Sequence, residues 1–283
     1  MPDARAAGLS INAATVKEQF DFREAAEACS RLGIPAFAPW RDQIAKVGIA
    51  DAARIVRDNG LRVTGIIRGG LFPAADKAGR AAAIEDNKRA VDEAAALHAD
   101  CLVLIAGGLP GGSKDIAAAR GMVAEGIAAL LPHARANKVP LALEPLHPMY
   151  AAERACVTTL AEALDICDLL APGDGRALGV AIDTYHVWWD PALAENIARA
   201  GRGNRILAHH ICDWLSPMRD MLLDRGMMGD GVIDFAGFRR MIEAAGYRGP
   251  QEVEIFSAHD WWQRPGDEVL KVCIERYDAL CRA

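Results

Sequence analysis

The sequence predicts an α/β protein built as one closed (β/α)8 barrel, a single domain spanning residues 1–283. Short apolar runs alternate along the chain with longer segments of helical spacing, and this alternation is typical of parallel strands joined by crossover helices. Eight strand–helix units fit within 283 residues, which is a usual length for one barrel domain. No GxGxxG motif follows the first apolar run, and its absence argues against a doubly wound open sheet.

Eight apolar runs are predicted to be the strands of this barrel. They cover residues 8–14, 34–40, 61–67, 101–107, 140–145, 177–183, 205–211 and 252–256. The segments with helical spacing between them include residues 21–33, 87–99, 120–136 and 235–246. Gly33, Gly60 and Gly246 stand where the glycines that end helices are expected.

Composition disfavours several classes of protein. The formal charge is −6 and the basic residues form no long run, so a nucleic-acid partner is not expected. The seven cysteines are scattered and form no CxxC motif, as is usual for reduced thiols in a cytoplasmic protein. The first residues do not follow the pattern of a signal peptide. No apolar run reaches the ~18 residues of a membrane helix, so no membrane partner is expected either.

Four consecutive predicted strands, the fifth to the eighth, each end in a side chain that binds metal ions. These are Glu144, Asp183, His210 and Glu254. In a barrel the carboxyl ends of the strands meet at one rim, where the active site lies. A single acid at a strand end is often only a helix cap, but four such side chains in succession indicate one site. Three carboxylates and one imidazole suit one divalent metal ion, such as Mn²⁺, Co²⁺, Mg²⁺ or Zn²⁺.

The two adjacent histidines of the seventh strand have different predicted roles. Neighbouring side chains on a strand point to opposite sides, so only one of them faces the barrel interior. His210 is in register with the small residue Ala208 and is therefore chosen as the ligand. His209 is expected to pack against the helical layer.

The motifs around these strand ends resemble those of a known family. "LEPLHP", "DTYHVWWD", "HHICDW", "GDGVIDF" and "EVEIF" are together similar to the xylose isomerase-like TIM barrels, over nearly the whole chain. That superfamily includes sugar phosphate isomerases and epimerases, inosose dehydratases and apurinic endonucleases. The resemblance implies a divalent metal bound by Glu144, Asp183, His210 and Glu254. It also implies that Glu144 and Glu254 act as acid and base, and that His186 contacts the substrate or a second metal.

A single cation flanked by carboxylates suits proton abstraction next to a carbonyl group. The metal chelates the ketone and the adjacent hydroxyl and stabilises the enediolate, while a carboxylate removes the proton. The sequence thus predicts a metal-dependent isomerase or epimerase of carbohydrate metabolism, acting on a sugar, a sugar phosphate or a related polyol. The alternative on the same metal site is a dehydratase, a lyase that acts on a keto-inositol or keto-sugar.

The sequence differs from two other classes of enzyme in the superfamily. Ketose 3-epimerases carry a Glu six residues after the first metal Glu and an Arg six residues after the metal His, but this chain has Tyr150 and Ser216 there. Glu153 and Arg219 are the candidates to replace them.

Apurinic endonucleases bind further zinc ions through histidines of the early strands, whereas the first histidine here is His98, in a helical segment. A hydrolase of that type and a non-catalytic metal-binding barrel remain as less favoured hypotheses.

Four further residues are predicted to contact the substrate. Arg68 ends the third strand and suits a phosphate or carboxylate, although a salt bridge at the rim is an equal alternative. His147 follows Glu144 by three residues, and Asp213 follows His210 by three, so either is placed to orient a ligand. Trp188 and Trp214 follow the sixth and seventh strands, where indole rings can stack on sugars. A homo-oligomer is a possible assembly, but no interface can be read from the sequence.

Overall fold

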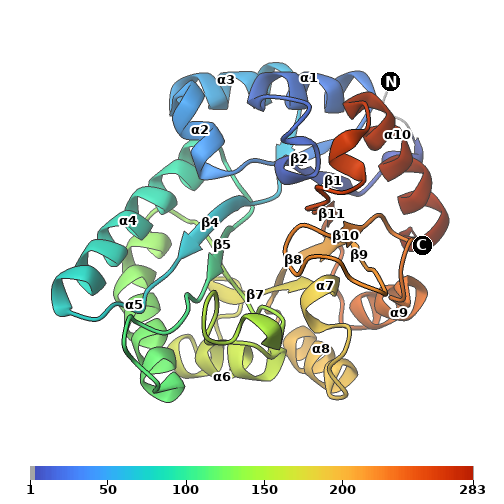
Figure 1. Ribbon diagram of the computed structural model, residues 1–283. Helices are drawn as coiled ribbons and strands as arrows, with labels where there is room; N and C mark the ends of the chain where they lie inside the picture. Colours follow the sequence, from blue (N-terminus) through green and yellow to red (C-terminus); the bar gives the residue numbers. More distant parts are fainter. Residues whose placement is uncertain (1–3, 283) are drawn as a thin grey trace.

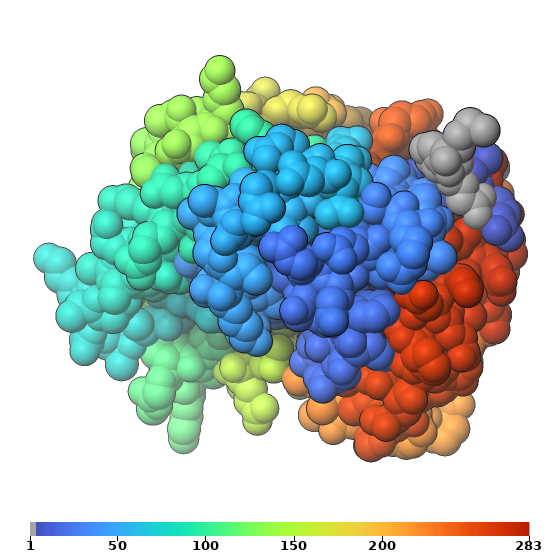
Figure 2. Space-filling model, turned by 90° about the horizontal axis from the view of Figure 1, so that it is seen from above, coloured from blue at the N-terminus to red at the C-terminus, as the bar shows by residue number. Residues whose placement is uncertain are grey.

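The computed structural model describes residues 4–282, which form a barrel of parallel strands surrounded by helices (Figure 1). Nine strands make one parallel sheet in the order β3-β2-β1-β11-β8-β7-β6-β5-β4, so the predicted barrel is confirmed. Their bounds are β1 (Leu9–Asn12), β2 (Ala36–Ala38), β3 (Arg62–Val63), β4 (Ile66–Gly70), β5 (Leu102–Ile105), β6 (Leu141–Glu144), β7 (Leu178–Asp183), β8 (Ile206–Ile211) and β11 (Gln251–Val253). β1 pairs with β11, which brings the two ends of the chain side by side (Figure 2).

The third predicted strand, residues 61–67, differs from the prediction. It is divided at Thr64–Gly65 into β3, which pairs with β2, and β4, which pairs with β5. Gly65 has no side chain to pack in a strand interior, and the Thr64 hydroxyl donates to the buried Glu252 carboxylate (2.7 Å). A single bridge between Trp40 and Ile67 joins the two sides. This division explains why the main sheet has nine strands instead of eight.

The helices follow the predicted segments, but two of them begin earlier than predicted, one by ten residues and the other, α5 (Ile116–Ala136), by four. α4 (Lys77–Ala96) begins ten residues before the predicted segment 87–99, because Asp76 caps it and its first turns are rich in alanine, which favours helix without an apolar face. The remaining helices are α1 (Phe22–Arg31), α2 (Arg41–Val47), α3 (Ile49–Asp58), α6 (Leu160–Leu170), α7 (Thr184–Val187), α8 (Leu193–Arg202), α9 (Phe235–Ala244) and α10 (Gly266–Arg276). Within residues 4–282, no helix has the length and apolar character needed to span a membrane.

The barrel interior is filled by small and branched side chains. One buried cluster consists of Ile67, Cys101, Val103, Ala142, Ala181 and Ala208, whereas the larger core lies between the strands and the helices. His209 points to this outer layer, as the alternation predicts. Its ring stacks on Phe238 of α9, and its Nδ1 lies 3.0 Å from the Ile182 carbonyl oxygen. The neighbouring His210 therefore points inward.

We predict that Asn87→Ala destabilises the protein. The buried Asn87 side chain accepts from the Gly70 amide (2.6 Å) and donates to the Gly70 carbonyl (2.7 Å), which fixes the end of β4 against α4. Its loss leaves two buried backbone groups without partners, so the free energy of unfolding should fall by about 3 kcal/mol. Urea denaturation measures the change. Asn59→Ala, which removes one half-buried hydrogen bond to Ile55, is the control, and an equal loss in both variants would contradict the prediction.

Candidate metal centre

Four side chains that can ligate a metal converge at the carboxyl ends of adjacent strands. Glu144 ends β6, Asp183 ends β7, His210 lies one residue before the end of β8, and Glu254 follows β11 directly. One ligand atom from each lies within 4.8 Å of the others, and all four residues are buried. The sequence reached the same four residues, because adjacent parallel strands that end at one rim deliver their last side chains to a common point.

Three buried carboxylates meet in this cluster, opposed by Arg225 and His210. Burial raises the pKa of Glu144, although His210 opposes the rise, and burial raises the pKa of Glu254 to about 8 against the effect of Arg225. Burial also opposes ionisation of Asp183, but Arg225 and two histidines outweigh it and keep its pKa below the usual value. Carboxylates crowded into a buried site favour a bound divalent cation, which would lower their pKa values.

The His210 ring is oriented by carboxylates on both sides. Its Nδ1 lies 2.9 Å from Glu144 Oε1, toward the centre of the cluster. Its Nε2 is buried without a hydrogen bond and lies 3.6 Å from Glu252 Oε1. A ring nitrogen that faces the other ligands, with a carboxylate behind the opposite nitrogen, is the arrangement common among metal-ligating histidines. The residues present therefore fit a divalent metal.

Arg225 is a residue of this centre that the sequence did not single out. Its Nη1 donates to Asp183 Oδ2 (3.1 Å) and Glu254 Oε2 (3.0 Å). Its guanidinium lies between the rings of Tyr185 and Phe256, with ring-centroid distances of 4.5 and 4.9 Å. Arg225 starts the short strand β10 (Arg225–Gly226), which pairs with β9 (Asp213–Trp214). The sequence around Arg225 does not resemble the end of a barrel strand. The nearby "GDG" turn, residues 229–231, was the only feature of this segment that the sequence pointed out.

The two candidates to replace the epimerase residues lie away from the cluster. Glu153 is exposed, and Arg219 is 52% exposed and forms an ion pair with Asp224. Tyr150, which stands at the epimerase Glu position, donates its hydroxyl to the Met221 carbonyl. Arg225, and neither of these two candidates, contacts the carboxylates of the cluster.

His186 lies directly beside the ligand cluster. Its Nε2 is 3.6 Å from Asp183 Oδ2 and 3.3 Å from Arg225 Nη2, and its Nδ1 accepts from the His147 amide (3.2 Å). Burial lowers the pKa of His186 to about 3, so this imidazole is neutral near pH 7. A neutral ring suits a hydrogen-bonding or ligating role better than that of a proton donor.

Three of the predicted substrate contacts lie in an aromatic cluster and not on the cavity wall. His147 packs on Trp214 (centroids 4.7 Å apart), and Trp214 packs on Tyr185 and Trp188. None of these rings lines the cavity that contains Glu144, Glu254 and His186. The loop after β7 coils into α7, and this path turns the indole of Trp188 toward Trp214.

Asp213 stabilises a neighbouring loop instead of the ligand cluster. Its carboxylate accepts from the backbone amides of Gly229, Gly231 and Ile233, so it shapes the "GDGVIDF" segment. Asp234 in that segment caps α9 by accepting from the Gly237 amide (2.8 Å), as its sequence position predicts.

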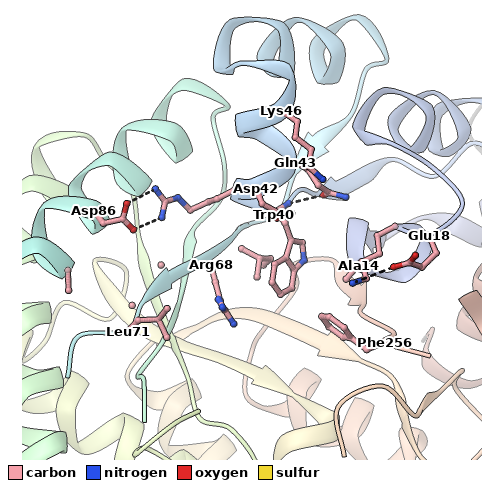
Figure 3. Close-up of a pocket in the computed structure, with 16 residues that line it drawn as sticks. Ala14, Glu18, Trp40, Asp42, Gln43, Lys46, Arg68, Leu71, Asp86 and Phe256 are labelled. Atoms are coloured by element: carbon pink, nitrogen blue, oxygen red, sulfur yellow. Dashed lines mark hydrogen bonds and ion pairs between the residues drawn. The ribbon is translucent and has the colours of Figure 1, made fainter. Parts of the chain in front are cut away.

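Arg68 lines two connected spaces at the barrel mouth. The inner cavity, of about 40 Å³, also contains Glu144, His186, Arg225 and Glu254. An outer groove of about 740 Å³ adjoins it, and Figure 3 shows Arg68 pointing into this groove beside Trp40. Of the four predicted substrate contacts, Arg68 is the one that faces the space next to the ligand cluster.

Comparison with known proteins gave consistent results. A family model described as "Xylose isomerase-like TIM barrel" matches residues 22–273, and no curated protein sequence matches the chain. Protein SMc04130 from Sinorhizobium meliloti 1021 is 67% identical, with a TM-score of 0.96 over 98% of this chain and 100% of that one. An IolI protein with a binding zinc atom is 18% identical, with a TM-score of 0.82 over 95% and 96% of the two chains. The 3-keto-D-glucoside 4-epimerase YcjR from E. coli is 18% identical, with a TM-score of 0.71 over 94% and 98%. At identities this low, the last two show a shared fold.

Proposed function

Because the chain belongs to the xylose isomerase-like TIM barrel family, we propose that it is a divalent-metal-dependent isomerase or epimerase of a keto-sugar or related polyol. The observation that carries the proposal is the buried cluster of Glu144, Asp183, His210 and Glu254. The zinc atom in the IolI structure and the epimerase activity named for YcjR support it. A cytoplasmic location is proposed with it.

The chain's own residues suit proton transfer next to a carbonyl. A bound divalent ion at this cluster supplies a Lewis acid for the carbonyl and the adjacent hydroxyl. Glu144 and Glu254 come from β6 and from the end of β11, on two sides of the centre, so one removes the α-proton and the other returns it. Arg225 and the neutral His186 both reach the inner cavity and are placed to bind substrate oxygens.

Proton exchange in D₂O tests this proposal. The protein, supplemented with Mn²⁺ or Zn²⁺, is incubated with a panel of ketoses, ketose phosphates, keto-inositols and keto-disaccharides. Deuterium at the carbon next to the carbonyl is followed by NMR and mass spectrometry. We expect deuterium to enter a product of unchanged formula. Loss of water with formation of an enone would replace the isomerase by the dehydratase. No exchange with any member of the panel would contradict the proposal.

A further inference from the structure

The outer groove holds far more space than the cavity beside the metal centre. It has a volume of about 740 Å³, compared with about 40 Å³ for the inner cavity, and both spaces are lined by Trp40, Ile67, Arg68 and Phe256. Binding sites for organic ligands usually measure roughly 300–1,000 Å³. Most of the room for a ligand that reaches the centre therefore lies in the groove, on the side of β1, β2 and β4.

Two aromatic rings form a fixed wall where the groove meets the inner cavity. The rings of Trp40 and Phe256 pack edge to face with centroids 5.6 Å apart. The Trp40 indole also donates to Asn12 Oδ1 (2.7 Å), and the Asn12 amide donates to Glu254 Oε1 (3.0 Å). These two hydrogen bonds fix the position of the Trp40 ring relative to Glu254, one of the four candidate metal ligands. Aromatic faces of this kind pack well against the C–H faces of sugars.

Arg68 offers hydrogen-bond donors without a partner at this junction. Its guanidinium is half-buried and lies 5.9 Å from the centroid of the Trp40 ring. Within residues 4–282 no acid forms an ion pair with it and no acceptor receives its hydrogen bonds; Arg154 is its largest charged neighbour, ahead of Asp42 and Glu254. A partly buried cation without partners is costly, so a ligand oxygen at this point would gain a strong, charge-assisted hydrogen bond.

The remaining polar groups of the groove have mixed character. Asp42 and Glu18 supply carboxylate acceptors, and Lys46 and Gln43 supply donors (Figure 3). Each hydroxyl of a sugar both donates and accepts, so a lining of both kinds suits a neutral sugar. Lys17, Arg41 and Asp86 also line the groove, and ion pairs join Lys17 to Glu18 and Arg41 to Asp86.

We propose that the groove is a second sugar subsite and that the substrate is a glycoside of at least two residues. The carbonyl end of the keto-sugar residue enters the inner cavity, Arg68 binds oxygens at the junction, and the rest of the glycoside packs on Trp40 and Phe256 in the groove. This inference rests on the proposed function and names the substrate class for the same centre.

Equilibrium binding tests the subsite without requiring turnover. The Mn²⁺-supplemented protein is titrated with methyl glucoside and with four disaccharides (cellobiose, maltose, sucrose and trehalose) by calorimetry. We expect at least one disaccharide to bind about tenfold more tightly than methyl glucoside, the equivalent of one or two hydrogen bonds. If no disaccharide binds more tightly than methyl glucoside, the subsite is overturned.

A pair of tryptophan substitutions tests whether the tighter binding of the disaccharide arises in the groove. Ala83 of α4 lines the groove, whereas Ala82 on the same helix is exposed and does not line it. Ala83→Trp should narrow the groove and weaken the preference for the disaccharide, while Ala82→Trp should retain it. Thermal melting checks that both variants fold. A preference that survives in Ala83→Trp would overturn the assignment to this groove.

The two proposals fail independently. Disaccharide preference without deuterium exchange on any ketose or keto-disaccharide would leave the subsite and remove the isomerase. Exchange on free ketoses without disaccharide preference would leave the isomerase and remove the glycoside.

Discussion

Glu254→Gln is expected to reduce turnover by about 10³-fold or more, because under the proposed function it removes both a metal ligand and an acid–base group. Two donors fix this carboxylate: Asn12 Nδ2 lies 3.0 Å from Oε1, and Arg225 Nη1 lies 3.0 Å from Oε2. A carboxamide in this position must turn its own N–H groups toward one of these donors. The variant therefore disturbs the geometry of the centre as well as its charge.

The measurement is kcat on the best substrate of the exchange panel, with the metal content of each sample determined beside it. Glu275→Gln is the control, since Glu275 is exposed on α10, and it should retain full activity. The thermal unfolding midpoints of both variants show whether a loss of turnover is due to lost catalysis or to a lost fold. Turnover near that of the original protein in Glu254→Gln would rule out the acid–base assignment.

Asp183→Ala and His210→Ala are each expected to abolish stoichiometric metal binding. Both side chains are buried, and each offers one of the four candidate ligand atoms, so neither loss can be replaced by a surface group. Arg225 Nη1 also contacts Asp183, which means that Asp183→Ala leaves this cation with one carboxylate fewer. Mass spectrometry of the purified protein should find about one divalent ion per chain, and a much smaller content in the two variants.

The neighbouring histidine supplies a matched control for the metal measurement. His209→Gln removes an imidazole that packs on Phe238 outside the barrel interior. It should lower stability but leave the metal content unchanged. Three zinc ions per chain would favour the hydrolase hypothesis instead, and no metal after incubation with Mn²⁺ would remove the basis of the proposed chemistry.

The residues predicted at the ends of strands could be located because barrel geometry converts a position in the sequence into a position in space. Glu144, Asp183, His210 and Glu254 end or follow apolar runs, and all such ends face one rim. The strand alternation also separated His209 from His210 without any structural information.

Loop side chains were less predictable, because their direction depends on the path of the folded chain. Trp188 and Trp214 follow strands as expected, yet they pack on each other and on Tyr185. Arg225 lies 15 residues beyond His210, in a segment without strand or helix periodicity, and reaches the centre through the β9–β10 pairing. The division of the third strand likewise depends on long-range contacts of Thr64, which local propensity does not encode.

Only a single bridge, between Trp40 and Ile67, joins the two ends of the described sheet, and this weak junction bears on how the substrate range of the protein can change in evolution. From β11 through β8, β7, β6 and β5 to β4, the strands form a continuous hydrogen-bonded wall, and this wall carries all four ligands. The opposite side, where β3 and β4 are not paired, borders the groove. The ligand cluster and most of the groove lining thus lie on different sides of the barrel, and Phe256 and Arg68 line both spaces where they meet. Exchange of residues 34–90 between relatives should transfer the range of accepted substrates while the reaction itself stays the same.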